Sequence, residues 1–169
     1  MSVPVVADAG PLIALSKLNA LPLLHLLYGQ VLLPGAVYLE AVTHGERSGY
    51  EDARTLRSYF EREGWKPVPG ITVGADLEAS KLDKGEKESL ALATQSRALL
   101  LVDDESARHE ARRLGVPVRG TLGVLIEAYR RGLLNAEQLR FYFQQIESRP
   151  DIWISPSLCR RLLHETLAE

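Results

Sequence analysis

The stretch that decides the fold is ALLLVDDESAR, residues 98–108. Its apolar run at 98–102 has no polar alternation and is the clearest strand in the chain, as expected for a strand buried in a parallel sheet. Asp103 and Asp104 follow at once, and a helix is predicted from residue 105. A buried strand that leads directly into a helix is part of a βαβ unit, so this stretch predicts an α/β protein.

The same alternation of strands and helices continues on both sides of this stretch. Buried strands are predicted at residues 3–7, 30–33 and 116–118. Helices are predicted at residues 12–18, 34–43, 50–63, 84–97, 105–114, 121–131, 135–147 and 156–167. Because crossovers between parallel strands are right-handed, this order predicts a three-layer α/β/α sandwich with a central parallel sheet.

Length and composition narrow the class of protein. With 169 residues, 46% hydrophobic and 25% charged, the chain is expected to form one globular domain rather than a disordered or disulfide-rich chain. Its formal charge of −2 provides no general attraction for nucleic acid, so such a partner would need a local patch or metal ions. Cys159 is the only cysteine, which favours the reducing cytoplasm.

One uncharged stretch has the length of a membrane span. Residues 18–39 contain no Asp, Glu, Lys or Arg, but Pro22, His25, Gly29 and Pro34 interrupt them. We therefore expect a buried helix, a buried strand and the start of another helix, with no membrane contact. Because the N-terminal apolar run lacks a preceding basic region and contains Asp8, no secretory signal is expected either.

Three aspartates follow predicted strands. Asp8 comes directly after the first strand, and Asp103 and Asp104 come after the strand at 98–102. Ligands of open parallel sheets bind beyond the carboxyl ends of the strands, so all three are candidate site residues. The alternative for each is a helix N-cap. Gly10 is the better cap after Asp8, and only one of Asp103 and Asp104 can cap the next helix.

Two glutamates lie where a charge is normally avoided. Glu40 is the only charged residue of its predicted helix, and Glu86 shares a helix face with Leu90 and Ala93. For either one alone, a rim position with the head group in water is the alternative. Four acidic positions from four segments are costly to bring together unless a cation neutralises them, so the set predicts a metal site.

The residue types of these acidic candidates indicate which metal they would bind and which chemistry that metal would support. Oxygen ligands without His or Cys suit Mg²⁺ or Mn²⁺, and the four histidines show no zinc-like pairing. The sequence has no GxxxxGK[ST], no GxGxxG after the first strand and no GxSxG, which argues against nucleotide hydrolysis, dinucleotide chemistry and α/β-hydrolase chemistry. A carboxylate-held Mg²⁺ polarises a phosphoryl group and activates water.

In their order along the chain, the motifs resemble those of the PIN-domain family. They are VVADAGPLIAL from residue 5, VYLEAV from 37, GEKESLALA from 85, LLLVDDESAR from 99 and GTLGVL from 120. The resemblance is closest to short prokaryotic PIN proteins of unassigned function. It implies a PIN-like nuclease domain over residues 1–134, with residues 135–169 as a helical extension packed on it.

The resemblance also implies an activity and a role for each acidic residue. PIN proteins bind Mg²⁺ or Mn²⁺ and hydrolyse phosphodiesters, usually of RNA, and many are toxins of toxin–antitoxin pairs. By position, Asp8, Glu40, Glu86, Asp103 and Asp104 become the catalytic candidates, and all of these except Glu40 become metal ligands. The chain departs from the family pattern where Ala-Gly follows the first aspartate, where Glu86 replaces an aspartate, and where Asp103 and Asp104 are adjacent.

Candidate substrate-binding residues lie after the central strand. Residues 105–140 contain seven Arg and four Glu, and Arg108, Arg112 and Arg119 are the candidates for a phosphate track. A solvated helix face is the alternative explanation of these arginines. Thr121 matches a Ser/Thr that lies near the site in the family, with a helix N-cap as the alternative.

These features lead to one main functional hypothesis and two alternatives. The main hypothesis is a metal-dependent ribonuclease, acting on single-stranded RNA and controlled by a small antitoxin protein. The first alternative is a PIN-fold module with weak catalysis that binds nucleic acid or protein. The second, a phosphohydrolase or receiver domain, lacks the expected DxD motif after the first strand and the expected late lysine. The sequence does not decide whether the protein forms a homodimer.

Overall fold

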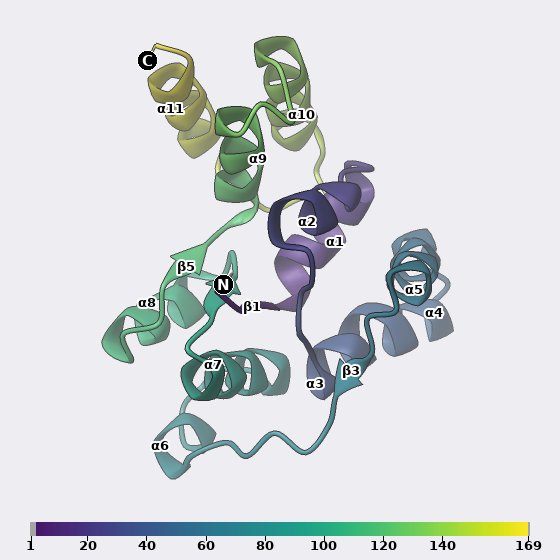
Figure 1. Cartoon of the computed structure of the whole chain (residues 1–169), viewed down its shortest axis with the longest axis vertical. Helices are drawn as coiled ribbons and strands as arrows, with labels where there is room; N and C mark the ends of the chain where they lie inside the picture. The colour runs from purple at the N-terminus through teal and green to yellow at the C-terminus, as the bar shows by residue number, and fades with distance from the viewer. Residues whose placement is uncertain (1–2, 169) are drawn as a thin grey trace.

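The strands of the computed structural model, which describes residues 3–168, form a parallel arrangement with β1 at its centre (Figure 1). On one side β1 pairs with β4, and β4 pairs with β5. On the other side, a parallel bridge between Val6 and Leu32 joins β1 to the pair of β2 and β3. The order is therefore β3-β2-β1-β4-β5. The strands are β1 (Val5–Ala7), β2 (Leu33–Pro34), β3 (Pro67–Val68), β4 (Leu99–Leu101) and β5 (Val118–Arg119).

The central strands are buried on both faces, as their unbroken apolar sequences predict. Val5 and Ala7 belong to one hydrophobic cluster, whereas Val6 between them belongs to a second cluster on the opposite face. In β4, Leu101 joins the first cluster and Leu100 the second. Since successive strand residues point to opposite faces, this alternation requires a layer of helices on each side of the sheet.

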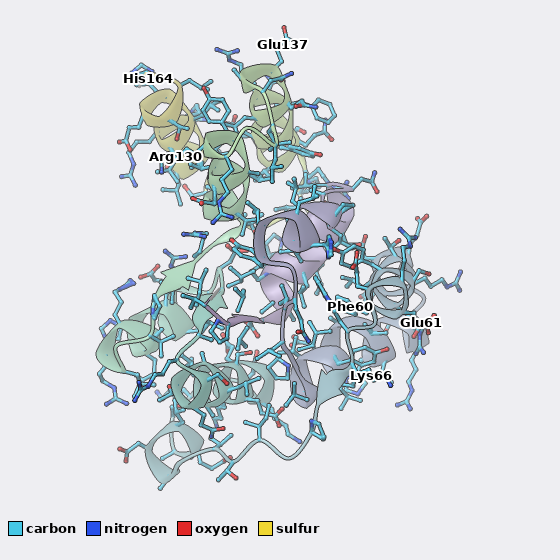
Figure 2. All side chains as sticks on the ribbon, viewed as in Figure 1. Phe60, Glu61, Lys66, Arg130, Glu137 and His164 are labelled. Atoms are coloured by element: carbon cyan, nitrogen blue, oxygen red, sulfur yellow. The ribbon has the colours of Figure 1, made fainter. Side chains whose placement is uncertain are left out.

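Helices supply those two layers. Apolar residues of α7 and α8 make up half of the cluster that contains Val6, and residues of α1, α2, α5 and α9 line the other. Phe60 of α5 lies in the cluster that contains Val5 and Ala7, whereas the next residue, Glu61, points to solvent (Figure 2). The helices of these layers are α1 (Ala9–Lys17), α2 (Pro22–Tyr28), α3 (Gly35–Tyr38), α4 (Gly45–Arg47), α5 (Glu51–Glu63), α6 (Ala75–Glu78), α7 (Lys84–Ser96), α8 (Glu105–Arg113) and α9 (Thr121–Arg130). The predicted three-layer α/β fold with a central parallel sheet is confirmed.

Two further helices, α10 (Ala136–Ser148) and α11 (Pro156–Leu167), pack beside α9 at one end of the molecule (Figure 1). Leu139, Phe143 and Cys159 from this segment are fully buried and belong to the same cluster as the core of α1 and α9. Glu137 and His164 project outward from it (Figure 2). The domain boundary at residue 134 stays a prediction.

Several element boundaries differ from those predicted. The first helix starts at Ala9, so Asp8 rather than Gly10 occupies the N-cap position. The helix predicted at 34–43 divides into α3 and η1 (Leu39–His44), a π-helical segment with a wider turn that contains Glu40. The uncharged stretch at 18–39 forms α2, β2 and α3. Among residues 3–168, no helix has the length and apolar character needed to cross a membrane.

Candidate active site

Asp8 lies at the carboxyl end of β1 and is the most deeply placed acidic residue of the candidate site. Its backbone N–H donates to the Leu101 carbonyl at 2.9 Å, which continues the β1–β4 pairing into the loop. The residue is only 6% exposed, and its side chain makes no cap bond with α1. The Ser89 hydroxyl of α7 donates to its Oδ1 at 3.5 Å. The Ala9 backbone N–H also interacts with the carboxylate and lowers its pKa, but this does not offset the cost of burial.

Burial and neighbouring negative charges raise the pKa of Asp8 to about 7. Burial is the largest cause, and the charges of Asp83, Glu40 and Asp104 add to it. These neighbours come from three other segments of the chain. The sheet edge therefore gathers acidic side chains around Asp8.

Glu86 and Asp83 enter this group from the start of α7. The Asp83 side chain accepts from the Glu86 N–H at 2.8 Å, and the Asp83 N–H donates to Glu86 Oε1 at 3.0 Å, which makes a capping box. Burial, the charge of Asp83 and a side-chain hydrogen bond with Asp104 raise the pKa of Glu86 to about 8. Two carboxyl groups form such a bond only when one of them carries a proton.

Asp104 caps α8 and at the same time faces Glu86. Its Oδ2 accepts from the Ala107 N–H at 2.9 Å, which is the N-cap bond predicted for one member of the aspartate pair. The side chain is exposed enough to reach solvent. Asp104 is therefore the member of the pair that joins the acidic group.

Glu40 approaches the same group from η1. A Cβ built on Gly85 would lie only 3.1 Å from Glu40 Oε2, so the absence of a side chain at Gly85 leaves room for this carboxylate. Burial and the charge of Asp83 raise the pKa of Glu40. The Ala36 N–H donates to Glu88 Oε1 at 2.9 Å and fixes α3, the helix before η1, beside α7. We call Asp8, Glu40, Asp83, Glu86 and Asp104 the carboxylate cluster.

Three helix N-termini surround the carboxylate cluster. Helix α1 begins after Asp8, α7 begins after Asp83, and α8 begins after Asp104. The partial positive charge of each N-terminus offsets some of the repulsion among the carboxylates. Because the pKa values of Asp8 and Glu86 are still raised, this offset is incomplete.

Asp103 differs from Asp104 in its partners, because both of its carboxylate oxygens are bound to Thr121. Its Oδ1 accepts from the Thr121 N–H at 2.8 Å and its Oδ2 from the Thr121 hydroxyl at 2.6 Å. Burial raises the pKa of Asp103, while these bonds and the charge of Arg108 oppose the shift. Asp103 thus connects the end of β4 to the start of α9. Its role as a metal ligand stays a prediction.

The four predicted substrate-binding residues all have partners inside the protein. Thr121 is fully buried and donates to Asp103, and Gly120, not Thr121, is at the N-cap position of α9. Arg108 Nη1 donates to the Val102 carbonyl at 3.1 Å. Arg119 Nη1 donates to the Tyr28 hydroxyl at 3.0 Å, and Arg112 Nη2 to Glu105 Oε1 at 2.7 Å.

Sequence reasoning missed two residues that contact the site. Asp83 lies three residues before Glu86, and this spacing indicates a capping box. The Asp83 side chain also brings a second carboxylate to the start of α7. Ser89 lies one helical turn after Glu86 and therefore shares its side of α7, facing Asp8. Helical spacing from Glu86 in both directions would have found both residues.

The carboxylate cluster fits a hard divalent cation in its chemistry. Its donors are all carboxylate oxygens, with a serine hydroxyl beside them, which suits Mg²⁺ or Mn²⁺. Within residues 3–168, no three His, Cys, Asp or Glu side chains are already arranged to hold an ion. The Glu86–Asp104 pair and the buried Asp8 are the groups that a cation would relieve most.

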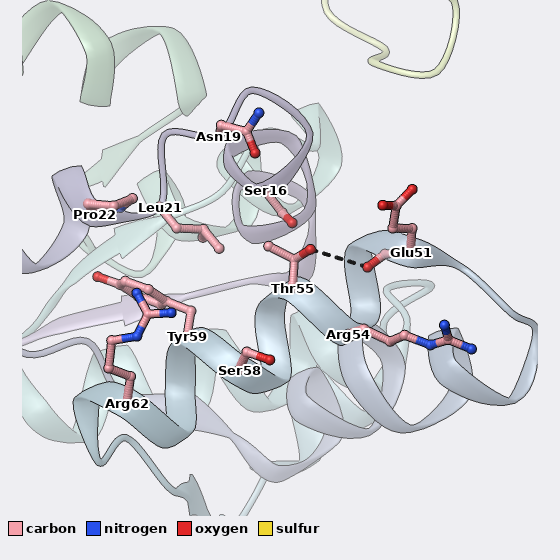
Figure 3. Close-up of a pocket in the computed structure, with 10 residues that line it drawn as sticks. All are labelled: Ser16, Asn19, Leu21, Pro22, Glu51, Arg54, Thr55, Ser58, Tyr59 and Arg62. Carbon is pink, nitrogen blue, oxygen red and sulfur yellow. Dashed lines mark hydrogen bonds between the residues drawn. The ribbon is translucent and has the colours of Figure 1, made fainter.

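A separate cavity of about 520 Å³ lies between the C-terminal end of α1 and helix α5 (Figure 3). Ser16, Ser58 and Tyr59 are among its lining residues, and Thr55 donates to the Glu51 carbonyl at 3.3 Å within it. No member of the carboxylate cluster lines this cavity. It lies at the opposite end of α1 from Asp8 and is not part of the candidate active site.

Comparison with known proteins agrees with the geometry. A family model described as a PIN domain matches residues 4–167, nearly the whole chain. A search of curated proteins finds no match. PIN domains are in general metal-dependent nucleases that use divalent ions. The matched region includes the parallel sheet, the carboxylate cluster and both C-terminal helices, and the chain belongs to the PIN-domain family.

Proposed function

We propose that this protein is a metal-dependent ribonuclease that hydrolyses phosphodiesters of single-stranded RNA. The observation that carries the proposal is Asp8, a buried carboxyl group surrounded by the charges of Glu40, Asp83 and Asp104. It lies between β1 and β4, where the strand order reverses, which is the usual position of a ligand site in such sheets.

Asp8, Glu86 and Asp104 are the residues that would hold Mg²⁺ or Mn²⁺. When bound, the ion would neutralise phosphate charge and lower the pKa of a water molecule. Asp8 is kept in place by burial and by Ser89, so it provides a fixed ligand. The raised pKa of Glu86 beside Asp104 means that Glu86 would lose a proton when a cation binds.

Glu40 is suited to a different role in the same reaction. It projects from η1 next to Gly85, and its raised pKa makes it a better proton acceptor than an ordinary glutamate. We propose that Glu40 orients a water molecule beside the phosphate and accepts its proton at a carboxylate oxygen. This role requires no direct contact between Glu40 and the ion.

The test is cleavage of a labelled single-stranded RNA pool by purified protein in Mg²⁺ or Mn²⁺, with EDTA as the metal-free condition. We expect cleavage with metal and none with EDTA. RNA binding without metal-dependent cleavage would support the alternative, a binding module with the PIN fold. Metal-independent cleavage that survives Asp8→Asn would refute the proposed site.

We also propose that a small protein of the antitoxin type controls this activity by covering the carboxylate cluster. The support is the family, together with an acidic site that opens at the sheet edge. If expression of the wild-type chain inhibits growth, co-expression of a small protein encoded beside its gene should relieve that inhibition, and the absence of any such protein would contradict this proposal. Asp8→Asn should cause no inhibition in the first place.

A further inference from the structure

Trp153 is the most exposed large hydrophobic side chain in the described part of the chain. Its exposure is 93%, whereas the other tryptophan, Trp65, is 6% exposed and packs in the core. An exposed indole loses the stabilisation that burial would give it. A tryptophan in such a position therefore suggests a contact that forms only when a partner binds.

The exposure of Trp153 does not come from a loose loop. Its neighbours Ile152 and Ile154 both pack against the main core, so only the middle residue of the three points outward. The indole N–H donates to the Pro150 carbonyl at 3.1 Å. Arg149 binds both Asp151 oxygens, at 2.9 and 2.8 Å, and holds the start of the loop. The indole is therefore presented in a fixed position.

Trp153 lies beside the candidate active site. It lines one cavity of about 490 Å³ together with Asp104, Gly10 and Asp103. It also lines a second cavity of about 540 Å³, and Asp103 is common to both. Both volumes fall in the roughly 300–1,000 Å³ range of small-ligand sites. The indole stands where the two cavities meet, next to a member of the carboxylate cluster.

The second cavity supplies positive charge. Arg108, Arg119 and Arg161 line it together with Asp103 and Glu105, and Glu105 is paired with Arg112. Arg161 is 66% exposed, and its contact with Glu165 is long, at 4.0 Å. Arg119 is held by the neutral Tyr28 hydroxyl rather than by a carboxylate. Gly123 leaves space for the Arg119 side chain, because a Cβ there would lie 2.6 Å from Arg119 Cγ.

We propose that Trp153 and Arg161 form a subsite for one nucleotide of single-stranded RNA, with the base stacked on the indole and a phosphate beside the guanidinium. The inference rests on the proposed ribonuclease function, and it adds residues of the C-terminal segment to the substrate site. Unstacked bases of single strands bind well to exposed aromatic rings. Arginine is well suited to phosphate because its donors are planar and paired. Arg119 lines the same cavity and adds a third donor side chain to it.

The experiment measures binding in the Asp8→Asn background, so that cleavage does not interfere. The probe is an oligouridine. In the parent protein, binding is followed by quenching of tryptophan fluorescence, which reports on Trp153 because Trp65 is buried. We expect Trp153→Ala to weaken binding about 5- to 150-fold, from ~1–3 kcal/mol for one stacked base, as measured by competition with labelled RNA. Trp153→Phe should keep most of the affinity.

Three comparisons separate stacking from other effects. Phe141→Ala, at a 55% exposed aromatic on α10, is the matched control and should leave binding unchanged. An oligomer of abasic ribose phosphates should bind Trp153→Ala and its parent equally. Arg161→Ala should reduce the slope of log Kd against log salt by about 0.7, the value for one phosphate contact on a single strand.

The result that overturns the subsite is equal affinity for oligouridine in Trp153→Ala and its parent. This result leaves the ribonuclease proposal intact if the wild type still cleaves RNA with metal. A wild type that neither cleaves nor binds RNA refutes the ribonuclease proposal and the subsite together. Loss of affinity for the abasic oligomer in Trp153→Ala also overturns the stacking role.

Discussion

Glu86 and Asp104 bring two carboxyl groups within hydrogen-bonding distance between the N-termini of α7 and α8. Each also has a structural role, since Glu86 completes a capping box and Asp104 caps α8. The pair is stable without metal only if one group keeps a proton. Stability, metal binding and pH are therefore coupled at this pair.

Stability without metal should fall as the pH rises from about 4 to about 7. The pKa of Asp8 is about 7 in the folded protein, compared with an ordinary value of 3.8. Below pH ~4 Asp8 is protonated in both the folded and the unfolded protein. Between pH ~4 and ~7 it is ionised only in the unfolded protein, which lowers the free energy of unfolding. At about 1.4 kcal/mol per pKa unit, the loss is on the order of 4 kcal/mol. Urea unfolding in EDTA at several pH values measures it. Asp8→Asn should make the fall between pH ~4 and ~7 shallower, while the raised pKa of Glu86 preserves part of it. An unchanged curve would contradict the assignment.

Added Mg²⁺ or Mn²⁺ should raise the melting temperature. An ion that binds only the folded state adds roughly 3 kcal/mol at about 100 times its Kd, which is about 5–10 °C for a domain of this size. Asp104→Asn should reduce this shift while keeping α8, because Asn is an equally good N-cap. The exposed Asp76→Asn on α6 is the matched control. Equal shifts in both variants would exclude Asp104 as a ligand.

Asp103 should act mainly as a structural residue. Asp103→Ala removes the acceptor of two Thr121 donors and should cost about 1–3 kcal/mol of unfolding free energy without metal. The metal-induced shift in melting temperature should remain. If Asp103→Ala instead keeps the stability of the metal-free protein and loses the metal shift, Asp103 is a ligand. Calorimetry with and without Mn²⁺ distinguishes the two outcomes.

Gly85→Ala should lower activity without lowering stability. The new Cβ would lie 3.1 Å from Glu40 Oε2, so the glutamate would have to move, while alanine is the better helix former. Cleavage rate and urea midpoint, measured on the same samples, test this. Gly74→Ala, where the new Cβ has nothing within 4 Å, is the control. Normal activity in Gly85→Ala would show that the position of Glu40 does not matter.

Patterns with a clear physical basis predicted most of the fold. Uninterrupted apolar runs identified β1 and β4, and the acidic residues after them were placed correctly at the sheet edge. Helix ends were less accurate. The start of α1 at Ala9 and the π-helical turn around Glu40 depend on how the chain packs onto the sheet, which local sequence does not determine.

The site was harder to predict at Asp103 and Asp104, two identical neighbouring residues with different hydrogen-bond partners. Asp104 takes the local cap bond with Ala107, whereas Asp103 bonds to Thr121, 18 residues away, which approaches it only in the folded chain. Asp83 was missed because an aspartate directly before a predicted helix is first interpreted as an N-cap and not as part of a site. Trp153 gave no local signal except the apolar residues on both sides of it.

The most direct test of the proposed active site is the single-turnover cleavage rate of a labelled single-stranded RNA as a function of Mn²⁺ concentration. The wild type and Asp76→Asn should show the same rise to saturation. Asp8→Asn should be at least about 100-fold slower at every Mn²⁺ concentration, in keeping with the loss of one group that stabilises the transition state, and its circular dichroism should be unchanged. An Asp8→Asn protein that cleaves as fast as the wild type would contradict the assignment of the carboxylate cluster as the active site.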